Sequence, residues 1–67
     1  MSDLVDRVVR VVELNTGGPQ PDTAREETVL TTLSSHNRYD PSSVRDALAT
    51  AVSEGRLIEE DGRYGTP

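Results

Sequence analysis

Two short stretches of this 67-residue sequence contain residue types that enzymes and metal sites use. Residues 34–40 include two serines, a histidine and an aspartate, the side chains of a hydrolytic triad, and residues 59–61 offer three carboxylates to a divalent cation. Closeness in sequence does not create triad geometry, and a hairpin tip rarely converges enough oxygens on one ion. With one histidine and no cysteine in the chain, we expect no enzyme activity, no metal site and no cofactor.

Arginine supplies the other recognisable chemistry, the binding of phosphate groups and base edges. Guanidinium groups form paired hydrogen bonds with phosphate oxygens and with guanine. The sequence contains seven basic residues and all of them are arginine. Four lie in the second half of the chain, at Arg38, Arg45, Arg56 and Arg63, where they would supply phosphate or base contacts if the chain bound nucleic acid.

The overall charge opposes that interpretation in ordinary salt. Twelve acidic residues against seven basic ones give a net charge of −5, and lysine is absent. This composition resembles proteins of halophilic archaea, where molar salt shortens the Debye length to about 3 Å and screens self-repulsion. A GC-rich genome that replaces lysine by arginine is the alternative. We favour a halophile because the acid excess and the lack of lysine occur together.

The length and hydropathy indicate one small domain, residues 1–67. There is no signal peptide and no apolar run near membrane-spanning length, so we expect a soluble cytoplasmic protein without a membrane partner. Only 33% of residues are hydrophobic, which predicts a marginal core that self-association would help.

Residues 40–64 give the clearest local signals. Asp40 is a good N-cap and Pro41 suits the first helical position. An apolar repeat at positions 44, 47, 48, 51 and 52 predicts a helix over about 41–54, which Gly55 ends in a left-handed conformation. The pair Asp61-Gly62 is a strong turn signal, so residues 56–66 are predicted to form a hairpin.

Two further helices are predicted before this segment. Residues 3–14 have a broad apolar arc, which either packs inward entirely or leaves Val5, Val9 and Val12 as a dimer seam. Residues 24–35 are expected to form the second helix, with Thr23 and Glu26 as a capping box. The loop between them contains two glycines and two prolines, which stop regular structure from resuming.

The order helix, helix, turn, helix, hairpin resembles the winged helix-turn-helix family. The most specific part is residues 41–45, leading to Glu54-Gly55-Arg56-Leu57-Ile58 and Asp61-Gly62-Arg63-Tyr64. The resemblance implies a mainly α fold with a small β-hairpin, in which the helix before the wing enters the major groove and the wing touches backbone. It assigns double-stranded DNA contacts to Arg38, Ser42, Ser43, Arg45, Asp46, Thr50, Arg56 and Arg63.

Two functions follow from this resemblance. The first is a small DNA-binding transcriptional regulator, dimeric through its first helix. The alternative is a winged-helix protein–protein interaction module of the replication or transcription machinery that never touches DNA, since the loop and tail are also similar to the small winged-helix domain of archaeal replicative helicase subunits. Arginines gathered on one face favour DNA binding, and scattered arginines favour the protein module.

Overall fold

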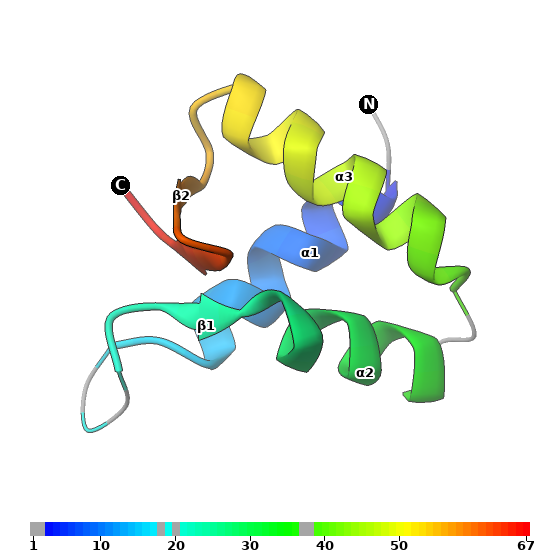
Figure 1. Ribbon diagram of the computed structural model, residues 1–67, viewed down its shortest axis with the longest axis horizontal. Coiled ribbons are helices and arrows are strands. Elements are labelled where there is room, and N and C mark those ends of the chain that lie inside the picture. The colour runs from blue at the N-terminus through cyan, green and yellow to red at the C-terminus, as the bar shows by residue number, and fades with distance from the viewer. Residues whose placement is uncertain (1–2, 18, 20, 37–38) are drawn as a thin grey trace.

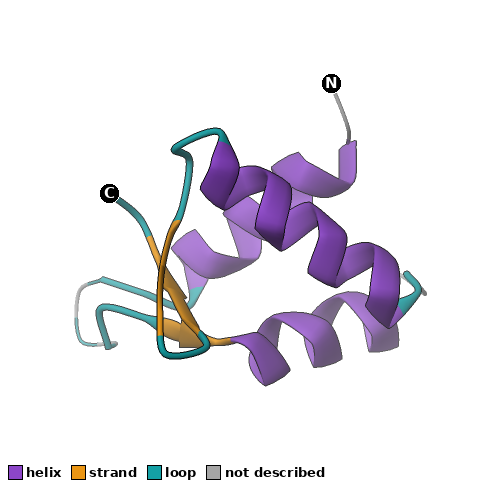
Figure 2. Cartoon of the chain, turned by 45° about the horizontal axis from the view of Figure 1, so that its top comes forward, coloured by secondary structure: helices purple, strands orange, loops and turns teal. Residues whose placement is uncertain are grey.

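The computed structural model describes residues 3–17, 19, 21–36 and 39–67, and contains three helices and three short strands. In chain order these are α1 (Asp3–Leu14), β1 (Ala24–Arg25), α2 (Glu26–His36), α3 (Pro41–Ser53), β2 (Ile58–Glu60) and β3 (Arg63–Gly65). The helices cross one another around a single core, and α1 packs most extensively against α3 (Figure 1). The strands form an antiparallel sheet in the order β1-β3-β2 at one end of the helices (Figure 2).

The apolar arc of α1 faces the core of its own chain. Its five valines, at positions 5, 8, 9, 11 and 12, are all buried, and Leu4 is half-buried against them. The prediction of a dimer seam at Val5, Val9 and Val12 is therefore wrong for these side chains, which are 6%, 8% and 0% exposed. The arc is wide because α1 packs against both α2 and α3, and also meets β3.

Helix α3 begins and ends where the sequence predicts. The Asp40 carboxylate accepts hydrogen bonds from the backbone N–H groups of Ser42 and Ser43, at 3.0 and 3.3 Å. At the other end Gly55 has a φ of 78°, and the N–H of Arg56 donates to the carbonyl of Ala51 at 2.9 Å. The N–H of Gly55 donates to the carbonyl of Val52 at 3.0 Å, and the two bonds together form a Schellman cap, which satisfies helix carbonyls that would otherwise lack partners.

The hairpin turn also forms at the predicted place. Asp61 and Gly62 have φ values of 51° and 80°, and two positive values in succession define the type I′ turn that matches strand twist. The turn sets the register, so Glu60 lies opposite Arg63 and Glu59 lies opposite Tyr64. Leu57, just before the hairpin, is buried in the core.

The start of the second helix differs from the prediction. Ala24 and Arg25 form strand β1, and the helix begins two residues later, at Glu26. The capping box of Thr23 and Glu26 is therefore wrong. Strand β3 has a free edge whose backbone groups need partners, and pairing of Ala24 with Tyr64 satisfies them while burying the Ala24 side chain.

The fold class is confirmed: a mainly α domain of three helices with a small β-hairpin wing. Strand β1 extends the wing by pairing with β3 on the side opposite β2. In the part of the chain that the structure describes, every helix is too short or too polar to cross a membrane.

Candidate nucleic-acid interface

The exposed side of α3 is the first part of the predicted interface. Its caps fix where the helix begins and ends, and its apolar residues Val44, Leu48 and Ala51 hold the opposite side in the core. The side chains left in solvent are all short except that of Arg45 at the border. Besides Pro41 at the N-terminus of the helix, the exposed residues are Ser42, Ser43, Arg45, Asp46, Ala49, Thr50 and Ser53.

Three of these residues turn toward α1. Ser43, Asp46 and Thr50 line a shallow hollow of about 260 Å³ together with Leu4 and Val5. The Thr50 hydroxyl donates to the backbone carbonyl of Asp46 at 2.9 Å, which satisfies it within the helix. This border of α3 is polar and carries one carboxylate.

Arg45 lies at the other border of α3, next to the start of α2. Its Nε is 3.8 Å from Oε1 of Glu26, and both side chains are well exposed, at 59% and 37%. The backbone N–H of Glu26 donates to the carbonyl of Gly62 at 3.2 Å. Glu26 thus contacts α3 through its side chain and the wing turn through its backbone, which places Arg45 near the wing.

Arg56 is directed to a different element. Its guanidinium donates to the Asp6 carboxylate on α1 at 2.7 Å, a charge-assisted hydrogen bond that joins the end of α3 to the first helix. Among the predicted DNA contacts that the structure describes, it is the one whose guanidinium is hydrogen-bonded to a carboxylate of its own chain.

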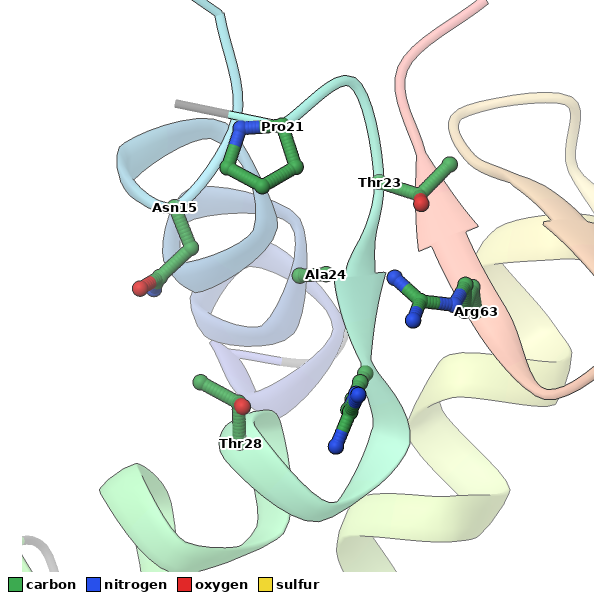
Figure 3. Close-up of a pocket in the computed structure, with 7 residues that line it drawn as sticks. Asn15, Pro21, Thr23, Ala24, Thr28 and Arg63 are labelled. Atoms are coloured by element: carbon green, nitrogen blue, oxygen red, sulfur yellow. The ribbon is translucent and has the colours of Figure 1, made fainter. Parts of the chain in front are cut away.

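Arg63 lies on the wing, directly across from Arg25 of β1. Both side chains are exposed and line one hollow of about 370 Å³ between the sheet, the end of α1 and the start of α2. In Figure 3 the Arg63 side chain extends from β3 toward β1. Arg25 was not among the predicted contacts, because its segment was assigned to a helix; only its pairing with β3 reveals where its side chain lies.

The wing also carries negative charge. Glu59 accepts a hydrogen bond from the backbone N–H of Gly62 at 2.8 Å, so its carboxylate stabilises the turn. Burial, followed by the nearby carboxylates of Glu26 and Glu59, raises the pKa of the Tyr64 phenol above its ordinary value. The negative potential of these carboxylates disfavours the phenolate, and it would also disfavour a phosphate group near the wing. Arginines close to the wing are therefore needed to offset this repulsion.

The structure therefore separates the predicted arginines into two groups. Arg45 and Arg63 lie around the start of α2 and the wing, where Arg25 joins them, whereas Arg56 is bonded to α1. Arg38 lies outside the described residues. Within the described chain, no group of three potential metal-ligating side chains occurs.

Comparison of the chain with protein-family models, curated proteins and solved structures found no match. The function therefore has to be argued from the arrangement of these residues.

Proposed function

We propose that this chain binds duplex DNA through α3 and the wing, and acts as a small transcriptional regulator in the cytoplasm of a halophilic archaeon. The observation that carries the proposal is the exposed side of α3, where short side chains lie between two caps and beside a type I′ wing. An α-helix with its side chains is about 10–12 Å across and the major groove is about 12 Å wide. Short side chains let the helix approach the base edges closely.

The polar groups on this side of α3 suit base recognition. Serine and threonine hydroxyls hydrogen-bond to either kind of base edge, and a carboxylate accepts from the amino group of cytosine. Asp46 is exposed at the border of this surface nearest α1, and its carboxylate would disfavour most bases and select for cytosine. In this proposal Ser42 and Ser43 read bases beside it.

Few phosphate contacts are available to this interface. Arg63 is offered to the backbone, and Arg45 can reach it by leaving its exposed 3.8 Å contact with Glu26, while Arg56 is hydrogen-bonded to Asp6. Two phosphate contacts give a salt dependence of about −1.8 in log K against log salt, far shallower than for binders with many contacts. A shallow dependence suits a protein that works at molar salt, where counterion release contributes little.

The test is fluorescence anisotropy with a random-sequence duplex pool, measured in KCl up to molar concentration. We expect binding by the wild-type chain and a loss of about tenfold in affinity for Arg45→Ala, because a hydrogen bond to a charged group contributes about 1.5–3 kcal/mol. Arg10→Ala, an exposed arginine of α1, is the matched control and should leave binding unchanged. No binding at any salt concentration would remove this function.

A second function, the protein–protein interaction module, is favoured by one specific observation. The hollow between α1 and α3 combines the apolar Leu4 and Ala47 with the Asp46 carboxylate, which suits a partner helix with an apolar residue beside a basic one. If the duplex pool does not bind, this hollow becomes the leading site, and Asp46→Arg should abolish association with the partner while the chain stays folded.

A further inference from the structure

The hollow beside Arg63 is a candidate site that neither of these functions uses as a whole. Segments far apart in the sequence line it: Asn15 just after α1, the loop at Pro21 and Thr23, strand β1, the first turn of α2 at Thr28, and β3. Figure 3 shows Arg63 reaching toward β1, with the small Ala24 side chain and the Thr28 hydroxyl beyond it. Its lining is thus two arginines and several neutral polar groups around a small apolar side chain.

The sheet register places the two arginines opposite each other. Arg25 and Arg63 are Cα partners on neighbouring antiparallel strands, and residues directly opposite each other project to the same face of a sheet. Like charges in this position destabilise a strand pair. An anion between the two guanidinium groups would relieve this repulsion.

The chain does not supply that anion among the residues that the structure describes. Glu60 lies opposite Arg63 on the other side, and Glu27 lines a neighbouring hollow with Arg25, yet neither carboxylate forms an ion pair with these arginines. Arg45 and Arg56, in contrast, each have a carboxylate within 4.0 Å. The unneutralised pair is the distinguishing feature of this hollow.

We propose that the hollow binds a phosphate group between Arg25 and Arg63. Each planar guanidinium presents a fork of N–H donors that matches two oxygens of one phosphate. Thr23 and Thr28 line the same hollow, and their hydroxyls add neutral hydrogen-bond donors for a tetrahedral oxyanion. This site does not depend on DNA recognition by α3, because it lies on β1 and β3.

The test is an NMR titration of the full chain with inorganic phosphate, in which KCl is reduced to keep the ionic strength constant. We expect saturable shifts of the amide signals of β1, β3 and the first turn of α2. Arg25→Gln and Arg63→Gln should each weaken phosphate binding by at least about tenfold. Arg10→Gln removes the same charge from a residue that does not line the hollow, and it should bind as the wild type does.

Two further ligands identify where the phosphate comes from. If Arg25→Gln weakens binding of a nucleoside monophosphate and leaves duplex binding unchanged, the site takes a free phosphorylated molecule. If it weakens duplex binding as well, the site holds a phosphate of the DNA backbone. Both results support the phosphate site, and Arg45→Ala, which tests α3, distinguishes a failure of DNA recognition from a failure of this hollow.

The stability of the ligand-free variants gives an independent measurement. Because each substitution removes a like-charge contact, Arg25→Gln and Arg63→Gln should melt no lower than the wild type without phosphate, and phosphate should raise the melting temperature of the wild type only. Phosphate and chloride acting equally at matched ionic strength, or wild-type phosphate affinity in both Gln variants, would overturn the proposal.

Discussion

The α1–α3 helix pair and the small sheet differ in what holds them in place. Val8, Val12, Val44 and Leu48 are completely buried where the two helices meet. The sheet buries fewer side chains: all three residues of β2 are exposed, and Ala24, the half-buried Tyr64 and Leu57, which precedes β2, connect this region to the core. The helices therefore carry the stability, while turn geometry and backbone pairing set the position of the wing.

This difference explains why the candidate phosphate site lies on the sheet. Side chains in the helix pair are constrained by close packing, so a change there affects folding. Residues of β1 and β3 that face solvent are constrained only by register, which leaves their side chains free to serve in binding. The comparison predicts that helix substitutions unfold the whole chain and that wing substitutions act locally.

The largest effect is expected for Leu48→Ala. Removal of a fully buried leucine costs about 2–5 kcal/mol, because transfer energy is lost and a cavity remains. A domain of this size has a total stability of only about 3–10 kcal/mol, so the substitution should remove a large share of it. Urea denaturation followed by circular dichroism in molar KCl measures the loss. Ala49→Ser, exposed on the same helix, is the control, and a loss below that range would mean that the core is not centred here.

Gly65→Ala should have the next largest effect and should act on the sheet. A Cβ at this position would lie 2.9 Å from the backbone carbonyl oxygen of Asp22, so strand β3 or the loop before β1 has to move. Overpacking of this kind costs about 1–3 kcal/mol. Amide exchange should increase in β1 and β3 while α1 and α3 stay protected. The exposed neighbour Thr66→Ala serves as control, and global unfolding without local exchange would contradict the comparison.

Gly62→Val tests the wing turn alone. Gly62 has open space around it, so the cost is the strain of a β-branched residue at a φ of 80°, about 1–2 kcal/mol. We expect the NMR contacts between β2 and β3 to weaken while helical circular dichroism is retained. Gly62→Asn tolerates this conformation better and should retain the hairpin. An unaltered hairpin in the valine variant would show that positive φ is not required there.

The smallest effect is expected for the ion pair of Arg56 with Asp6. Both side chains are exposed, at 36% and 48%, and exposed pairs contribute about 0.2–1 kcal/mol. A double-mutant cycle with Arg56→Ala and Asp6→Ala at low salt should give a coupling energy in that range, and molar KCl should reduce it. A coupling above that range would mean that this surface contact fixes α1 against α3 more strongly than exposure implies.

Local signals predicted the elements whose geometry is set by neighbouring residues. Asp40, Pro41 and Gly55 delimit α3, and Asp61-Gly62 forms the wing turn, because capping and positive φ depend on a few adjacent atoms. The register of Glu59 and Glu60 against β3 followed from the length of the turn.

The candidate site was predicted only in part. The short exposed side chains of α3 follow from helical periodicity, and they lie where expected. The partners of Arg45 and Arg56 are Glu26 and Asp6, separated by 19 and 50 positions in sequence, so no local pattern connects them. Arg25 was missed because a pair of residues carries too little periodicity to distinguish a strand from the start of a helix.

The sequence by itself determined where the chain turns and which faces of its helices are apolar, since these depend on backbone conformation and on spacing within one element. Only the tertiary structure decided that all the α1 valines are buried, that Ala24 and Arg25 join the sheet, and that Arg63 meets Arg25. Each of these depends on a surface that another element provides. An unpaired strand edge or an uncovered apolar face lowers the free energy of the folded state only when another element packs against it.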